Sequence, residues 1–289
     1  PSAQWPAWPG PVGGKFSAKA DWSAGKPAAD FMLDLHGTPL RDIPFSLESR
    51  GRYDGGALNL AQTVLRSGAS RLQAQGRATA PFDLKAEVQS PDLANLWPGL
   101  KGSGRLRGSL QGTLDQPHVV AEGRVDKLAY GDFTLERANL DADLDPQRPS
   151  RLDLQLQNLA AGLGVPEASL HAQGTAARHE IQLKTRTQAG GVELGLHGAL
   201  DRKHLVWSGQ LASGHGTPDE LPDWTLEEPA DLRYARDNID LEAACWRSSQ
   251  GRACVQFHRQ DAAMRVAFRL QDWAFAYFQS FLPPQWTVG

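Results

Sequence analysis

A five-residue signature, Leu-x-(Leu/Ala/Ser)-x-Gly, recurs along the chain and closes one short stretch of alternating apolar and polar residues after another. Because the side chains of a β-strand alternate between two faces, the marked residues of each copy share one face. The glycine permits a positive φ or a close approach of a neighbouring strand, and so marks a turn or bulge. The copies are Leu33/Leu35/Gly37, Leu47/Ser49/Gly51, Leu72/Ala74/Gly76, Leu170/Ala172/Gly174 and Leu194/Leu196/Gly198, with a variant at Gly108/Leu110/Gly112. The pattern predicts an all-β chain folded as one long antiparallel sheet.

Strand-like alternation fills most of the remaining sequence. Further stretches with one aliphatic and one polar face are Phe82/Leu84/Ala86/Val88, Ala138/Leu140/Ala142/Leu144, Leu152/Leu154/Leu156, Val192/Leu194/Leu196, Ile239/Leu241/Ala243 and Val266/Phe268/Leu270. Only residues 92–97 and 273–281 favour short helices, and prolines end both. We expect a single continuous elongated segment over residues 1–289, with an irregular stretch at 1–14. Two short helices cannot cover so many strands, so the sheet must close its apolar face on itself or leave it open as a groove.

The two cysteines end facing strand-like runs. Cys245 closes the run 239–246 and Cys254 opens the run 254–258, with a polar, glycine-containing stretch between them. Opposed residues of an antiparallel pair come within disulfide reach, so a cross-hairpin bond fits, with two buried free thiols as the alternative. A disulfide would indicate an oxidising compartment. If alternation is strict, Cys245 and Leu241 lie on one face of their strand. Pairing Cys254 with Cys245 then places the apolar Phe257 on the opposite face. A β-bulge would resolve this conflict.

Charge and motif content exclude several classes of protein. The chain carries 30 basic and 33 acidic side chains without a basic block, so we expect no nucleic-acid partner. It has no stretch long and apolar enough for a membrane helix and no initiator Met, which predicts an excised or processed segment of a longer protein. Nucleotide-binding loops, hydrolase elbows and metal-ligand clusters are missing from the sequence, and the histidines favour solvated strand ends. We therefore expect no enzyme activity, no cofactor and no metal. The nine tryptophans are scattered singly, and we expect them to cap the groove or seal its ends.

Several segments carry a resemblance to a known family. They are residues 91–117 with Leu96-Trp97-Pro98-Gly99-Leu100, residues 224–232, the Cys245 to Cys254 hairpin and Leu282-Pro283-Pro284. They resemble the TamB family, the inner-membrane subunits of the translocation and assembly module among the AsmA-like proteins, and the resemblance runs from about Trp5 to Pro284. It implies an elongated β-taco, a U-shaped curved sheet with an apolar groove, in the periplasm of a Gram-negative bacterium. The parent protein would be anchored in the inner membrane.

The same resemblance implies a function and a set of site residues. The groove would conduct phospholipid between the inner and outer membranes, and the family is also linked to outer-membrane protein assembly. The outer-membrane barrel partner TamA would be engaged through regions of the parent chain that are not present here. We expect acyl chains to contact the aliphatic faces of separate strands. The expected groove-lining residues are Leu72, Phe82, Leu84, Val88, Leu140, Leu144, Leu152, Leu154, Leu156, Val192, Leu194, Leu196, Ile239, Leu241, Val266, Phe268 and Leu270.

Three alternatives share the same period of two. A transmembrane β-barrel would need strands with aromatic girdles, which the scattered aromatic residues do not supply. A secreted β-solenoid would show a tighter and more even repeat. An interaction module is the third alternative, in which the sheet receives the β-strands of outer-membrane proteins by edge augmentation.

Overall fold

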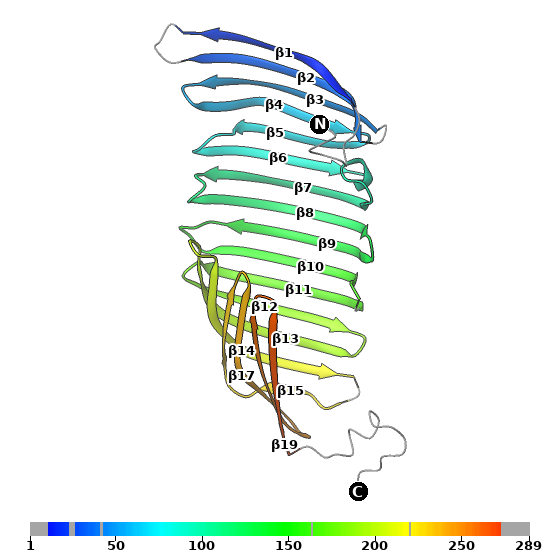
Figure 1. The fold of residues 1–289 in the computed structure, drawn as a ribbon, viewed down its shortest axis with the longest axis vertical. Helices are drawn as coiled ribbons and strands as arrows, with labels where there is room; N and C mark the ends of the chain where they lie inside the picture. The colour runs from blue at the N-terminus through cyan, green and yellow to red at the C-terminus, as the bar shows by residue number, and fades with distance from the viewer. Residues whose placement is uncertain (1–10, 23–26, 41–42, 163, 220, 273–289) are drawn as a thin grey trace. The chain divides into compact units, whose positions relative to one another are not determined.

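The computed structural model describes residues 11–22, 27–40, 43–162, 164–219 and 221–272. Nineteen β-strands in one antiparallel sheet and one short 3-10 helix make up its regular structure, which confirms the all-β prediction (Figure 1). The elements are β1 (Val12–Asp21), β2 (Ala28–Leu40), β3 (Ile43–Asp54), β4 (Ala57–Ser67), β5 (Ser70–Arg77), β6 (Phe82–Ser90), η1 (Leu93–Asn95), β7 (Lys101–Gly112), β8 (Pro117–Tyr130), β9 (Phe133–Leu144), β10 (Ser150–Ala160), β11 (Gly164–Thr175), β12 (Arg178–Thr187), β13 (Gly190–Asp201), β14 (Val206–Pro218), β15 (Trp224–Leu226), β16 (Ala230–Ala235), β17 (Asn238–Ser248), β18 (Gly251–Gln260) and β19 (Ala263–Gln271).

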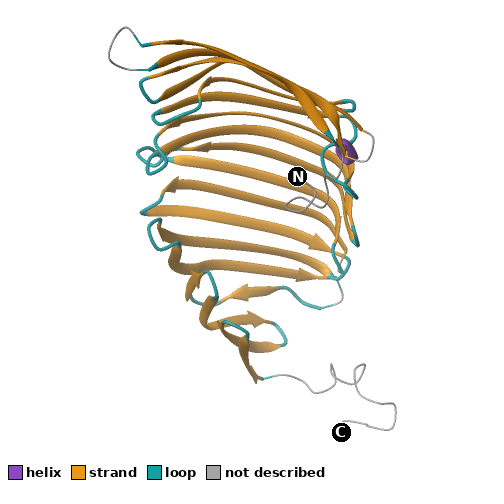
Figure 2. Cartoon of the chain, turned by 45° about the horizontal axis from the view of Figure 1, so that its top comes forward, coloured by secondary structure: helices purple, strands orange, loops and turns teal. Residues whose placement is uncertain are grey.

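The chain divides into two compact units, residues 1–167 and 168–289, with the division inside β11. In the first unit, β1 to β10 pair antiparallel with their neighbours along the chain and form a curved sheet (Figure 2). In the second unit the meander is interrupted once. There β14 pairs with both β15 and β16, and β17 pairs with the same two short strands.

The glycines of the recurring signature act in the two ways that the sequence predicts. Gly76 has a φ of +111°, a conformation in which a side chain would be strained. Gly51 instead lies under the ring of Phe31, where an added Cβ would come within 2.7 Å of ring carbons. One glycine therefore adopts a backbone conformation that other residues disfavour, and the other makes room for an aromatic ring on the neighbouring strand.

The predicted helix at 92–97 is shorter than expected. Only residues 93–95 form a 3-10 turn, whose N-cap Asp92 accepts a hydrogen bond from the Ala94 backbone N–H. Val12, expected to be irregular, begins β1 instead. The second predicted helix, 273–281, and residues 1–10 lie outside the described residues.

A β-bulge between Leu241 and Ala244 shifts the register of β17 against β18. It resolves the conflict seen in the sequence, because Leu241 then pairs with Phe257 while Cys245 pairs with Cys254. The two cysteines form a disulfide across the hairpin, with their Cα atoms 4.0 Å apart.

Candidate functional site

The first unit carries one face without charge, which we call the apolar face. Residues directly opposite one another in register lie on the same side of an antiparallel sheet, so the strand pairs trace rows of side chains across the strands. The row at one edge comprises Val12, Gly37, Phe45, Ser67, Ser70, Ser90, Gly104, Val125, Ala138 and Leu156. The second row comprises Gly14, Leu35, Leu47, Leu65, Leu72, Val88, Leu106, Gly123, Leu140 and Leu154.

The next two rows continue the same face. The third comprises Phe16, Leu33, Ser49, Thr63, Ala74, Ala86, Gly108, Ala121, Ala142 and Leu152. The fourth comprises Ala18, Phe31, Gly51, Leu60, Gly76, Leu84, Leu110, Val119 and Leu144. None of these four rows contains an Asp, Glu, Lys, Arg or His.

Side-chain size differs between the rows. From β3 to β9 the third row consists of small residues, and we call this stretch, Ser49 to Ala142, the small-residue row. The rows on both sides of it are mainly Leu and Val. The two flanking rows are four residues apart along each strand, so they form aliphatic ridges about 13 Å apart. The strip between them crosses from β3 to β9 with about 4.8 Å between neighbouring strands, so it is about 29 Å long.

Most of this face is at least partly exposed. Within the second to fourth rows only Ser49 and Ala142 are buried, and Leu106 is 44% exposed. The hydroxyl groups of Ser49 and Thr63 bond each other at 2.7 Å, so they satisfy their polar atoms within the row. The turn around η1 covers part of the edge row. Its carbonyl groups at Asn95 and Asp92 accept hydrogen bonds from Ser67 and Ser70.

The opposite face of the first unit is charged. Cross-strand ion pairs join Arg107 to Glu122 at 2.6 Å and Arg66 to Glu48 at 2.8 Å. A surface hollow on this side is lined by Arg107, Glu122 and Arg124 among others, so its walls are ionic. The Arg124 guanidinium, and then that of Arg137, hydrogen-bond Asp126 and lower the pKa of its carboxyl to about 2. The two faces thus differ sharply in polarity.

The predicted groove residues of the first unit all lie on the apolar face. Leu72, Phe82, Leu84, Val88, Leu140, Leu144, Leu152, Leu154 and Leu156 belong to the four rows or, for Phe82, to the position beyond Leu84 on β6. The residues predicted from the sequence are the large side chains of this face and do not include the small-residue row between them. A signal was present, since the middle position of the signature is Ser49 in one copy and Ala74 in another.

In the second unit the apolar face packs partly against itself. Leu211, Leu226, Ala230 and Ala244 form a buried cluster. The predicted groove residues that pack on this cluster are Leu194, Leu196 and Leu241. Val192, Ile239, Val266, Phe268 and Leu270 lie on the same side in register, and Phe268 is 75% exposed.

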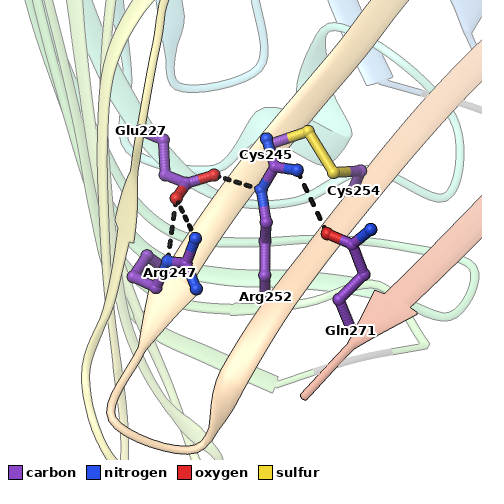
Figure 3. Close-up of a disulfide and its surroundings, with 6 residues drawn as sticks. All are labelled: Glu227, Cys245, Arg247, Arg252, Cys254 and Gln271. Carbon is purple, nitrogen blue, oxygen red and sulfur yellow. Dashed lines mark hydrogen bonds and ion pairs between the residues drawn. A yellow bond between two sulfur atoms is a disulfide. The ribbon is translucent and has the colours of Figure 1, made fainter. Parts of the chain in front are cut away.

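The disulfide lies on the polar side of the second unit, beside a cluster of charges (Figure 3). Glu227 accepts hydrogen bonds from Arg247 at 2.8 Å and from Arg252, and the Arg252 bond is the main cause that lowers the pKa of the Glu227 carboxyl. Arg252 also donates to Gln271 at 3.2 Å. These contacts tie β17, β18 and β19 together around the bond.

Neither a metal centre nor a membrane helix is found in the part of the chain that the structure describes. No three His, Cys, Asp or Glu side chains among those residues are grouped so that they could hold a metal ion. No helix there is long and apolar enough to cross a bilayer.

Comparison with known proteins points to one family. The family model described as TamB, N-terminal domain, matches residues 1–289. The translocation and assembly module subunit TamB of Haemophilus influenzae (strain ATCC 51907 / DSM 11121 / KW20 / Rd) is 22% identical over 263 residues, which cover 86% of this chain and 20% of that protein. The chain thus spans about a fifth of the length of this relative. No solved structure matches the chain.

Proposed function

This chain belongs to the TamB family, and from that premise we propose that the apolar face of its first unit holds phospholipid acyl chains. The parent protein would carry the lipid between the inner and outer membranes of a Gram-negative bacterium. In this proposal the segment lies in the periplasm and the parent chain is anchored in the inner membrane. Other regions of that chain bind TamA. The segment makes and breaks no covalent bond.

The observation that carries the proposal is the small-residue row between two aliphatic ridges. A linear hydrocarbon needs a long, narrow and uncharged surface, and the row provides one across β3 to β9. The hydrocarbon core of a bilayer, which two acyl chains fill end to end, is about 30 Å thick. A strip about 29 Å long therefore exceeds the length of one extended chain.

The energetics favour such a surface over free diffusion. Exposing an acyl chain to water costs about 0.8 kcal/mol per CH₂, so a chain of about 16 carbons costs roughly 12 kcal/mol. Contact with Leu, Val and Ala side chains removes most of this cost. Because the rows offer no charged anchor, the chain could slide along them, while the head group stays in water.

A photo-crosslinking experiment tests the proposal in the full-length protein. A benzophenone amino acid replaces Ala86 in the small-residue row, and in a matched control it replaces Lys85, the adjacent residue on the polar face. After irradiation of living cells, mass spectrometry of the purified protein should find phospholipid adducts at position 86 and not at position 85. Equal background labelling at both positions would overturn the proposal.

A second candidate is the addition of outer-membrane protein strands to an edge of the sheet. It is favoured by β19, which is exposed along its whole length and pairs with β18 alone among the registered strand pairs of the described residues. Its exposed backbone is the template that strand augmentation needs. The same irradiation at a β19 position, such as Arg265, would then give protein adducts instead of lipid adducts.

A further inference from the structure

The side chain of Trp207 lies across three strands of the second unit. Trp207 is on β14, and its indole N–H donates to Nε2 of His179 on β12 at 2.7 Å. Between them is Gly198 on β13, where an added Cβ would come within 2.6 Å of the Trp207 ring. A Cβ at Gly209, two residues along β14, would come within 2.8 Å of the same ring. The indole therefore lies low on the sheet, over two glycines.

Phe31 covers Gly51 in the first unit in a similar way, but no ring of the described residues lies over Gly108 of the small-residue row. Gly198 and Gly209 are opposite one another in register, between His179 on β12 and Leu232 on β16, so two adjacent strands carry no side chain at this level. At Gly108 in the small-residue row, by contrast, the three atoms nearest to an added Cβ are the Val120 carbonyl oxygen and the Cα and Cβ of Ala121. Gly108 in the small-residue row and the glycine pair of the second unit thus differ in whether an aromatic ring lies over them.

Hydrogen bonding fixes the ring in this place. An indole N–H can only donate and a backbone carbonyl can only accept, so the bonds of His179 define its tautomer. Its Nδ1–H donates to the Thr175 carbonyl at 3.0 Å, and its Nε2 accepts from Trp207. The Thr175 carbonyl at the end of β11 thus holds the imidazole in position to retain the indole.

We propose that Trp207 is a gate residue, whose indole, retained by His179, keeps acyl chains off this part of the second unit. The inference rests on the proposed function, because a gate is needed only if acyl chains reach the apolar side of the sheet. It assigns a specificity role to a tryptophan outside the buried cluster of Leu211, Leu226, Ala230 and Ala244. Movement of the Trp207 side chain would uncover the two adjacent glycines, Gly198 and Gly209.

The test uses the full-length protein with the benzophenone amino acid at Tyr234. Tyr234 is aromatic, half exposed and opposite Trp207 in register, so the probe replaces a side chain of similar shape beside the gate. In the otherwise unchanged protein we expect phospholipid adducts at position 86 and background labelling at position 234. Trp207→Ala should raise labelling at 234 to the level at 86. His179→Ala, which removes the imidazole and with it the retaining bond but keeps the indole, should give labelling between these levels, and Trp207→Phe tests the ring without its N–H.

The outcomes separate the gate from the function on which it rests. Strong labelling at both positions without any substitution would overturn the gate, as would background labelling at 234 in the Trp207→Ala protein when position 86 is labelled. Labelling at 234 that appears only in Trp207→Ala, with position 86 unlabelled, would support the gate and overturn the assignment of the first unit. Thiol labelling under denaturing conditions checks that the Cys245–Cys254 disulfide has formed in each variant, so that an unfolded second unit is recognised.

Discussion

The Oγ atoms of Ser70 and Ser90 lie 2.6 Å apart on the apolar face, and both side chains are at most 2% exposed. The Ser70 hydroxyl also lies 3.2 Å from the carbonyl oxygen of Asp92, to which it donates, so Ser90 is the donor in the bond between the serines. The neighbouring Ser67 donates to the carbonyl of Asn95. Three serines in one row thus hold the turn around η1 over the edge of the face.

Removal of one hydroxyl should release this turn. Ser70→Ala leaves the Ser90 hydroxyl without its acceptor and the Asp92 carbonyl without its donor, which costs about 1–3 kcal/mol for buried polar groups. Urea denaturation should show this loss, and hydrogen exchange should become faster in residues 93–97. Ser109→Ala, on the polar face of β7, serves as the matched control and should change neither measurement. Unchanged exchange in Ser70→Ala would show that the serines do not hold the turn.

A charge on the aliphatic ridge should block lipid passage without unfolding the sheet. Leu154 lies in the second row of the apolar face, and the adjacent Gln155 is exposed on the polar face. Leu154→Asp places a carboxylate against an acyl chain, at a cost of several kcal/mol when no partner is present. Cells that depend on the full-length variant should lose outer-membrane integrity, measured by detergent sensitivity, whereas Gln155→Asp should be silent. Normal integrity with well-expressed Leu154→Asp would count against an acyl path along this ridge.

Bulk in the small-residue row should have the same effect by a different cause. Ala86→Phe adds no charge but fills the low strip between Val88 and Leu84, so an acyl chain loses its contact with the sheet. The yield of phospholipid adducts at a second position in the row, Ala121, should fall. Lys85→Phe adds the same side chain on the other face and should leave the yield unchanged, so an equal fall in both variants would contradict a path along the row.

Strand identity and the two faces could be predicted from the sequence, because both depend on the period of two. Leu72 and Val88 are paired in register on the apolar face as their alternation requires, and the β-bulge follows from the parity of the cysteines. The rows could not be predicted. Which residue of one strand lies opposite which residue of the next depends on turn lengths and bulges, so the alignment of Ala86 with Gly108 is visible only in the fold.

The sequence leaves open whether the apolar face closes on itself or stays open, and it does not predict which part of the sheet does which. Leu194 and Leu241 have the same alternation as residues of the open first unit, yet they pack on a buried cluster. The cause is topological, since β14 pairs with two short strands, β15 and β16. A local pattern specifies which face of a strand is apolar, but not whether another part of the sheet covers that face.

The charged face predicts a dependence of stability on pH. In the folded protein the bonds from Arg124 and then Arg137 lower the pKa of Asp126 to about 2, below the ordinary value of about 3.9. The ion pair therefore stabilises the fold above about pH 4, and this stabilisation is lost as the pH falls to about 2. We expect a contribution of at most about 1 kcal/mol, because water screens a partly exposed pair. Thermal unfolding would be measured between about pH 5 and 2, where protonation of Asp126 removes the ion pair. The melting temperature of Asp126→Asn should depend less steeply on pH than that of the unsubstituted protein. Identical slopes for Asp126→Asn and the unsubstituted protein would contradict the role of Asp126.

The disulfide should stabilise the second unit in particular. Cys245 and Cys254 close a loop with a sequence separation of 9, for which the loss of unfolded-state entropy corresponds to about 2–3 kcal/mol. The double substitution to Ser should lower the stability of the second unit by this amount and increase hydrogen exchange in β17 to β19, while exchange in β3 to β9 should not change. Arg247→Gln, which removes one of the two arginine contacts to Glu227 and keeps the disulfide, should have a much smaller effect because it is an exposed ion pair. Faster exchange in both units after loss of the disulfide would mean that the two units unfold together, and the bond would then be a brace for the whole segment.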